Sequence, residues 1–299
     1  ASYDAAVAGG AGIVVGPLSK QAVAELATRP DRALPVLALN RIDSEDSPVV
    51  GSSALVQFAL APEDEARSIA DIAFGQGARD AMIMRPEGDW GSKVAQALID
   101  RWQELGGTIT SSVTFRGRED YSASVKEALA IPASEARAKA LQGILGNQLE
   151  FNARRRQDVD AVFLLSNSGA EARSLKPLLA FHYAGSIPVY AISGIYSGIP
   201  DPRDRDLEGI NFVEIPWLLD GDPELRNTIK EGKTGTDSYA RLNALGTDAF
   251  LLQSQFLRLQ AGADALFRGN TGLLTMDPSL HIQRELALAK FDDGAITAQ

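Results

Sequence analysis

The sequence contains no cysteine, which excludes disulfides, a thiolate nucleophile and a thiolate metal site. Histidine is scarce as well: His182 and His281 are the only two, they lie far apart, and neither has a metal-ligand companion at helical or strand spacing. We therefore expect no catalytic histidine. The missing cysteines do not fix the compartment, because a periplasmic protein can also lack disulfides.

Long hydrophobic runs and basic charge are lacking too. No apolar stretch approaches the roughly 18–20 residues that a helix needs to cross a bilayer. The opening A-S-Y-D-A-A-V has neither the charged nor the apolar region of a signal peptide, although a mature or excised fragment would look the same. A formal net charge of −10 argues against nucleic acid as a partner. What remains, 299 residues with 45% hydrophobic and 23% charged side chains, is typical of a globular protein of about two domains.

Motifs for phosphate binding and covalent catalysis are also missing. Residues 11–20, A-G-I-V-V-G-P-L-S-K, are rich in glycine, but Pro17 follows Gly16 where a Walker A loop needs lysine, and Val15 stands where a dinucleotide loop needs its third glycine. The segment instead predicts a turn into a buried strand. There is no G-x-S-x-G or S-x-x-K. Hydrolysis by paired carboxylates stays open, because a sequence does not show their spacing. We predict no catalytic residue, no metal and no cofactor.

Short β-rich runs alternate with amphipathic helical segments, the pattern of a parallel α/β sheet. Several of the runs are almost wholly apolar, as expected where helices cover both faces of the sheet. The predicted strands are 13–15, 35–39, 81–84, 109–115, 161–165, 187–192 and 210–215.

Three helices are well indicated. One begins at a Ser92 cap, ends at Gly106-Gly107 and carries the stripe Val94, Leu98, Trp102 and Leu105. A second precedes Gly262 and carries Leu245, Ala249, Leu252, Phe256 and Leu259. The third, Ser134–Glu150, carries Leu141, Ile144, Leu145 and Leu149 and is an unusually long excursion between strands. After Gly269 a turn-rich stretch and partial alternation predict a terminal antiparallel pair.

Polar residues follow several of the predicted strands. In open α/β sheets, ligands bind in the crevice beyond the carboxyl ends of the strands. Loop residues at such positions also often cap helices or are merely solvated. The candidates for a ligand-binding cleft are Ser19, Asn40, Arg85, Asp89, Trp90, Tyr121, Asn167, Ser193 and Tyr196.

The basic triplet Arg154, Arg155 and Arg156 stands out in this acidic chain. It has two interpretations. The arginines can lie at a helix end and pair with the acids that follow them in the sequence. Alternatively, they form a docking patch for an acidic partner surface.

The segments Y-D-A-A-V-A-G-G-A-G-I-V-V-G-P-L-S-K, D-A-M-I-M-R-P-E-G-D-W-G and G-T-D-A-F-L-L-Q resemble type I periplasmic binding proteins. The segments R-R-R-Q-D-V-D-A-V-F-L-L, L-K-P-L-L-A-F-H-Y-A-G-S-I-P-V-Y-A-I-S and I-P-W-L-L resemble, more narrowly, the C-terminal domain of penicillin-binding protein activators. The resemblance covers nearly the whole chain.

That resemblance implies an α/β, bilobed, type I periplasmic-binding-protein-like fold, with two doubly wound parallel-sheet lobes joined by crossover segments. One lobe would comprise 1–115 plus 220–267, and the other 116–219 plus 268–299. The first strand and helix of the fold would be missing. The Ser134–Glu150 excursion departs from ordinary solute receptors and is a candidate family-specific surface.

The function implied by the resemblance is that of a non-catalytic periplasmic regulator. Such a protein stimulates a bifunctional peptidoglycan synthase, a class A penicillin-binding protein, by protein contact. In the full-length family member a lipidated N-terminus, absent from this chain, attaches it to the outer membrane. The alternative is a periplasmic receptor that binds an amino acid, a peptide or a cell-wall fragment in the cleft between the lobes.

Overall fold

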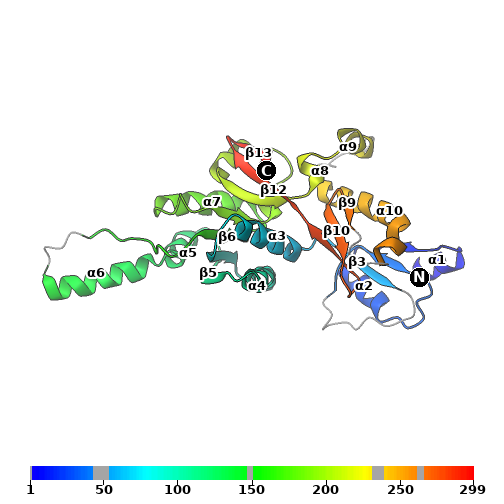
Figure 1. The fold of residues 1–299 in the computed structure, drawn as a ribbon, viewed down its shortest axis with the longest axis horizontal. Coiled ribbons are helices and arrows are strands. Elements are labelled where there is room, and N and C mark those ends of the chain that lie inside the picture. Colours follow the sequence, from blue (N-terminus) through cyan, green and yellow to red (C-terminus); the bar gives the residue numbers. More distant parts are fainter. Residues whose placement is uncertain (1, 43–53, 147–150, 231–238, 261–265) are drawn as a thin grey trace. The chain divides into compact units, whose positions relative to one another are not determined.

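The computed structural model describes residues 2–42, 54–146, 151–230, 239–260 and 266–299 (Figure 1). The chain forms two compact units. The first comprises Ala1–Asp64 and Ile215–Ala287, and the second comprises Glu65–Glu214 and Leu288–Gln299. Each unit is therefore assembled from separate segments of the chain.

The boundaries of the units differ from the predicted ones. Residues 65–115 belong to the second unit, and residues 268–287 belong to the first. The reason lies in strand pairing: the strand at Asp80–Pro86 pairs with the one at Ala161–Leu164, whereas His281–Glu285 pairs with Leu55–Phe58. A sequence shows each strand but not its partner.

The first unit contains a six-stranded mixed sheet in the order β1-β2-β3-β11-β10-β9. Strands β1, β2, β3 and β11 run parallel, and β9, β10 and β11 form antiparallel pairs. Its strands are β1 (Val14–Val15), β2 (Val36–Ala38), β3 (Leu55–Phe58), β9 (Phe267–Gly269), β10 (Gly272–Met276) and β11 (His281–Glu285). Its helices are α1 (Ser2–Ala8), α2 (Lys20–Ala27), α8 (Pro216–Leu219), α9 (Pro223–Lys230) and α10 (Ala240–Gln260).

Alternation along the strands sends side chains to two separate cores. On β2, Leu37 packs with Val56 and Phe58 of β3 and with Leu245 and Leu252 of α10. The flanking side chains of the same strands point to the opposite face, where the core consists of Tyr3, Val23, Ala27, Val36, Ala38, Ile42 and Leu55. Helices α1 and α2 thus cover one face of the sheet and α10 covers the other, because side chains alternate along a strand.

A buried carboxylate ties α10 to the β9–β10 turn. Asp248 is fully buried and accepts hydrogen bonds from the backbone N–H and side-chain amide of Asn270, both at 2.8 Å. It also accepts from the backbone N–H and hydroxyl of Thr271, at 2.7 and 2.6 Å. Four donors compensate the burial of this side chain. Gly269 gives it room, since a Cβ there would lie 2.5 Å from Asp248 Oδ2.

The second unit contains a seven-stranded sheet in the order β13-β12-β8-β7-β6-β4-β5. Its strands are β4 (Asp80–Pro86), β5 (Thr108–Phe115), β6 (Ala161–Leu164), β7 (Val189–Ala191), β8 (Ile210–Glu214), β12 (Ala287–Asp292) and β13 (Ala295–Ala298). Its helices are α3 (Pro62–Gly75, begun in the first unit), α4 (Asp89–Glu104), α5 (Tyr121–Ala128), α6 (Ile131–Leu145) and α7 (Gly169–Phe181), with short 3₁₀ turns η1 (Ser193–Ile195) and η2 (Pro202–Leu207).

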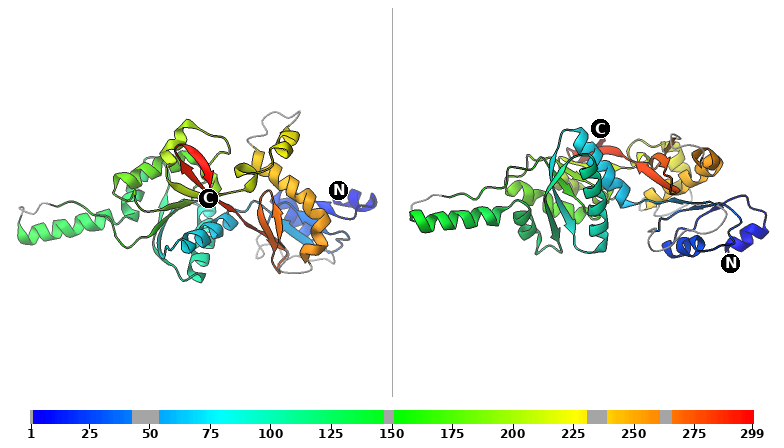
Figure 2. Two further views of the ribbon diagram at one scale, coloured as in Figure 1. Left: turned by 45° about the horizontal axis from the view of Figure 1, so that its top comes forward. Right: turned by 60° about the horizontal axis from the view of Figure 1, so that its bottom comes forward.

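The strand order reverses at β4. The chain passes from β4 outward to β5, then returns to the other side of β4 and continues through β6, β7 and β8, all parallel. Because such crossovers are right-handed, reversal places helices on both faces of the sheet. The right-hand view of Figure 2 shows α3 and α4 on one side and α5 and α7 on the other. The doubly wound parallel arrangement predicted from the sequence is confirmed for this unit, with an antiparallel β12–β13 edge.

Helix α4 keeps the predicted stripe but not the predicted cap. Val94, Leu98 and Trp102 are buried, and the Trp102 ring packs edge-on against Phe163 at 5.1 Å. The N-cap is Gly88, four residues before Ser92. Ser92 lies inside the first turn, where its hydroxyl donates to the Gly88 carbonyl at 2.9 Å. In the described part of the chain no helix is long and apolar enough to span a membrane.

Candidate functional site

Several of the predicted cleft residues lie at the strand ends around the switch point of the second unit, where β4 and β6 are neighbours. From β4, the Arg85 guanidinium donates to Ser92 Oγ at 3.2 Å, which holds it over the first turn of α4. Asp89 and the half-buried Trp90 begin that helix. From β6, Asn167 is exposed, and its Cα lies so close to Gly194 that a Cβ there would approach to 2.6 Å.

Carboxylates of the chain itself occupy the two adjacent strand ends. Beyond β6, the Ser166 hydroxyl donates to Glu171 Oε2 at 2.6 Å. Beyond β7, the buried Glu65 accepts from the backbone N–H of Ser193 at 2.9 Å and from its hydroxyl at 3.0 Å. A serine hydroxyl and a free N–H are donors that a ligand carboxylate would use. Here Glu65 already uses both donors of Ser193.

The two predicted tyrosines lie in the core of the second unit. The Tyr121 ring packs edge-on against Phe115 at 5.6 Å, and burial raises the pKa of its hydroxyl. Tyr196 packs against Phe212 and Phe291 at 6.0 and 6.1 Å. Both side chains are buried, which differs from the ligand-facing positions predicted from the sequence.

Ser19 and Asn40 belong to the first unit, at the ends of β1 and β2. Asn40 donates through its amide to the Leu18 carbonyl at 2.8 Å, and its Oδ1 accepts from the Arg41 N–H at 2.9 Å. Ser19 is the N-cap residue of α2, and its side chain makes no cap hydrogen bond. Asn40 thus joins the two loops, while the hydroxyl of Ser19 stays exposed.

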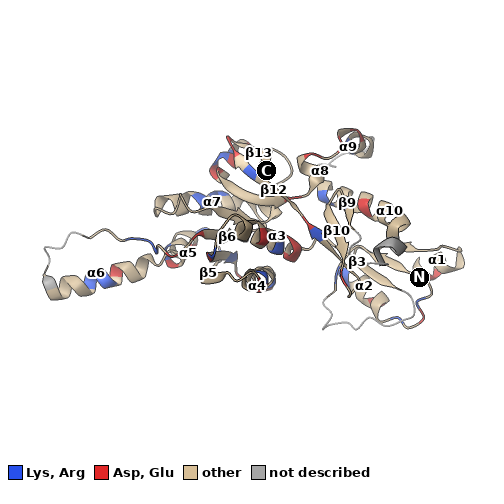
Figure 3. Ribbon diagram, viewed as in Figure 1, with Lys and Arg blue, Asp and Glu red and all other residues tan. Residues whose placement is uncertain are grey.

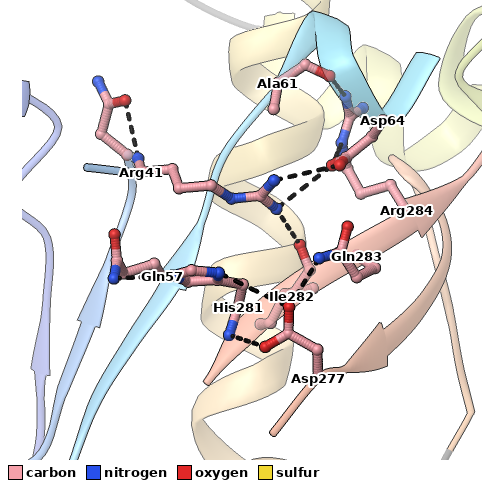
Figure 4. Close-up of polar contacts among 10 residues, drawn as sticks. Arg41, Gln57, Ala61, Asp64, Asp277, His281, Ile282, Gln283 and Arg284 are labelled. Atoms are coloured by element: carbon pink, nitrogen blue, oxygen red, sulfur yellow. Dashed lines mark hydrogen bonds and ion pairs between the residues drawn. The ribbon is translucent and has the colours of Figure 1, made fainter. Parts of the chain in front are cut away.

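A polar cluster in the first unit was not foreseen from the sequence (Figure 4). Asp64, whose side chain is 1% exposed, lies between two arginines: Arg41 Nη1 is 3.2 Å from Oδ1, and Arg284 Nε is 3.7 Å from Oδ2. Arg41 also donates to the Ile282 carbonyl at 2.9 Å, and Arg284 to the Ala61 carbonyl at 3.2 Å. The cluster joins the segment that follows β2, strand β11 and the start of α3. Its only signal in the sequence is Arg284, which falls in an alternating strand at a position where an apolar side chain is expected.

His281 extends this cluster. Its Nε2 lies 3.1 Å from the Gln57 amide nitrogen, and its Nδ1 faces Asp277 at 3.6 Å. Asp277 accepts in addition from the backbone N–H groups of Ser279 and His281 and from the Gln283 amide, contacts that outweigh burial and lower its pKa. Burial lowers the pKa of His281, against the opposing effect of Asp277. Within the described residues no group of three or more His, Asp or Glu side chains is placed to hold a metal ion.

The arginine triplet divides into separate roles. Arg156 forms an ion pair with Asp158 at 2.8 Å and donates to the Thr110 carbonyl. Arg155 donates to the carbonyls of Tyr183 and Arg156, both at 2.8 Å. Arg154 is exposed, and its side chain forms no ion pair with another described residue. Local pairing therefore accounts for Arg156, and docking by the triplet stays a prediction.

One hollow of about 430 Å³ lies in the first unit between α1, β1 and α2. Its lining includes Tyr3, the glycine-rich stretch at Val14–Pro17, and Arg29. The Arg29 guanidinium is already paired with Asp4 and Asp31, and these carboxylates raise its pKa. The guanidinium that lines this hollow is thus already paired within the chain.

Comparison with known proteins assigns the chain to a family. The family model described as "LppC putative lipoprotein" matches residues 2–294. The chain is 32% identical over 294 residues to the penicillin-binding protein activator LpoA of Klebsiella pneumoniae and 31% identical over 302 residues to that of Escherichia coli. Both alignments cover 96% of this chain but only 41% and 44% of the relatives, so the chain spans less than half their length.

Solved structures give the same fold. The C-domain of LpoA from Haemophilus influenzae, described as a regulator of PBP1A, superposes with a TM-score of 0.79 at 25% identity, covering 100% of this chain and 85% of that one. The leucine-binding protein LivK of Thermotoga maritima superposes at 0.54 and 16% identity, over 100% and 82% of the two chains. The latter likeness shows the type I binding-protein fold alone, as predicted.

Proposed function

Because the chain belongs to the LppC putative lipoprotein family, we propose that it is a non-catalytic regulator that stimulates a peptidoglycan synthase, a class A penicillin-binding protein, by protein contact. The observation that carries this proposal is similarity to named penicillin-binding protein activators over 96% of the chain, which includes most of both units. The strand ends of the second unit support it, because Glu65 and Glu171 occupy donors that a small ligand would need.

The same family description bears on the place of action. We propose that the protein acts in the periplasm, held at the outer membrane by a lipid anchor, and the description of its family as putative lipoproteins supports the anchor. From there it would reach a synthase that builds the cell wall. To test this placement, cells are fractionated with and without detergent, and an antibody against the chain detects it in each fraction.

The direct test adds the purified chain to the class A penicillin-binding protein of the same organism. Glycan polymerisation and peptide cross-linking are measured on lipid-linked precursor, with and without the chain. We expect at least one of the two rates to rise with the concentration of the chain and then to saturate. Unchanged rates at saturating chain, with a synthase that is active alone, would contradict the proposal.

A solute receptor is the second candidate, favoured by the fold likeness to LivK. A ligand at a hundred times its Kd would stabilise the folded chain by about 2.7 kcal/mol. Thermal unfolding with amino acids, peptides and muropeptides separates the two functions. A saturable shift with one of them would support the receptor function.

A further inference from the structure

Helix α6 packs along only half its length. Ile131, Ser134 and Ala138 are buried, at the spacing of one helical face, and the helix packs against α5. After Ala138 no described side chain of α6 is buried. Figures 1 and 2 show this second half extending away from the other helices and strands of its own unit.

Two large apolar side chains lie on the unpacked half. Leu141 is 48% exposed and Ile144 is 80% exposed. With Arg137 they follow the spacing i, i+4 and i+7, so all three share one face of the helix. Two solvated helical turns gain little stability from packing, and isolated helices of this length are marginal in water. The face has the spacing by which a helix docks in an apolar groove of a partner.

Exposed cations lie on the same helix and at its base. Arg137, Lys139 and Arg154 are exposed, and none forms an ion pair with another described residue. Arg154 lies at the base of the helix, where its backbone N–H donates to Ser134 Oγ at 3.2 Å. The only acid in α6 is Glu135, in a chain whose net charge is −10. Figure 3 shows the basic residues on α6.

We define the arm as α6 (Ile131–Leu145) together with Arg154, and we propose that it is the element that docks on the synthase. Its Leu141–Ile144 face would enter an apolar groove, and its cations would face carboxylates at the rim of that groove. This inference rests on the proposed function and adds the surface and the chemistry of the partner. Opposite charges steer such an encounter and align the partners.

A second copy of the chain fits the arm less well than a partner of this chemistry. Two copies would each carry a net charge of −10, and such repulsion keeps molecules apart. An arm bound to a different surface of the next copy would also be a head-to-tail contact, which extends into open chains unless a rotation closes it.

The test compares variants by their affinity for the class A penicillin-binding protein, measured by biolayer interferometry at several salt concentrations. The apolar variant is Leu141→Ser with Ile144→Ser. The charge variant is Arg137→Glu with Lys139→Glu and Arg154→Glu. All five side chains are exposed, so the fold should persist, and circular dichroism checks this. Matched controls at exposed positions elsewhere are Phe250→Ser and the triple variant Arg118→Glu, Arg205→Glu and Arg268→Glu.

We expect each arm variant to bind at least about tenfold more weakly, as for a hot-spot side chain, and the controls to stay within about twofold. The charge variant should also lose most of the salt dependence. If the unchanged chain binds the synthase and the arm variants bind equally well, the arm proposal is wrong while the proposed function stands. If the unchanged chain does not bind, both fail. Self-association that only the arm variants abolish, seen by sedimentation velocity, would assign the arm to a second copy instead.

Discussion

The side-chain amide of Gln57 lies 3.1 Å from Nε2 of His281, and only a neutral imidazole can accept a hydrogen bond from it. The orientation of the amide is fixed from its other end, where Oε1 accepts from the backbone N–H of Ile42 at 2.8 Å. A protonated ring would present a second N–H to the amide NH₂. The pair therefore favours the neutral form of His281 in the folded chain.

The first prediction is that the free energy of unfolding falls as the pH is lowered from 7 toward 5. Burial lowers the folded-state pKa of His281, so below about 6.5 the unfolded chain binds a proton that the folded chain does not. Stability is then lost as the pH falls. Each unit of pKa difference is worth about 1.4 kcal/mol. Urea unfolding at several pH values measures this loss.

His281→Gln should make that pH dependence shallower. His182 is also expected to contribute, since burial lowers its pKa too, and His182→Asn serves as the comparison. An equally steep loss of stability in the double variant would show that the histidines are not its source.

The second prediction concerns Asp64. Asp64→Asn removes the charge between the guanidinium groups of Arg41 and Arg284, whose side chains are 18% and 0% exposed. Breaking a buried pair from one side leaves uncompensated charge and costs about 3–5 kcal/mol. Urea unfolding followed by tryptophan fluorescence measures it. Asp31→Asn, an exposed partner of Arg29, should leave the urea midpoint unchanged; equal effects of the two changes would contradict the assignment.

The third prediction uses two glycines with opposite surroundings. Gly269→Ala places a Cβ 2.5 Å from the fixed carboxylate of Asp248, and such overpacking costs about 1–3 kcal/mol. Gly246→Ala, inside α10, meets nothing within 4 Å and should stabilise by about 0.5–1 kcal/mol. Differential scanning calorimetry of the two variants measures the sign of each change in stability. A gain at Gly269 would be evidence against the close approach.

The fourth prediction concerns Ser193. Ser193→Ala removes the hydroxyl that donates to Glu65 and leaves that buried carboxylate short of a donor, a loss of about 1–3 kcal/mol. Ser197→Ala, which removes an exposed hydroxyl bonded to the Ile199 carbonyl, should stay within about 0.5 kcal/mol. Chemical denaturation of both variants makes the comparison, and indistinguishable curves would refute it.

Local patterns predicted the elements better than their partners. All seven predicted strands exist within a few residues, and the stripe of Val94, Leu98 and Trp102 is buried as expected. Leu55–Phe58 was missed, because a segment of four residues is too short for its periodicity to separate strand from helix. The cap was placed at Ser92 instead of Gly88, since glycine carries no side chain to signal a cap.

The segment after Gly269 and the predicted helix Ser134–Glu150 show the same limit: local patterns reveal elements but not their partners. The tail after Gly269 pairs antiparallel as expected, but β11 and β12 follow one another and join different sheets. The excursion is helical over Ile131–Leu145, and residues 147–150 of the prediction lie outside the described residues. Alternation predicts which side of a strand is buried, but not which strand lies beside it.

The strand ends were predictable in their position, and a ligand site at them stays a prediction. Strand ends beyond β4, β6 and β7 do bring Arg85, Asn167 and Ser193 to one edge of a sheet, as parallel topology requires. The hydrogen bonds from Ser193 to Glu65 were not predictable, because the two residues are 128 positions apart in the sequence. Tyr196 was predicted from its position after a strand, but the Phe212 and Phe291 rings that bury it come from distant segments.

The pairing of β3 with β11 has a consequence for synthesis on the ribosome. His281 pairs with Gln57 across the sheet, so β3 gains its second neighbour, β11, only after nearly the whole chain has been translated. The second sheet can pair β4 to β8 as soon as residue 214 has emerged. Contacts between remote residues form slowly. The nascent chain should therefore complete its middle first, leaving its earliest segment exposed to chaperones and proteases for longest.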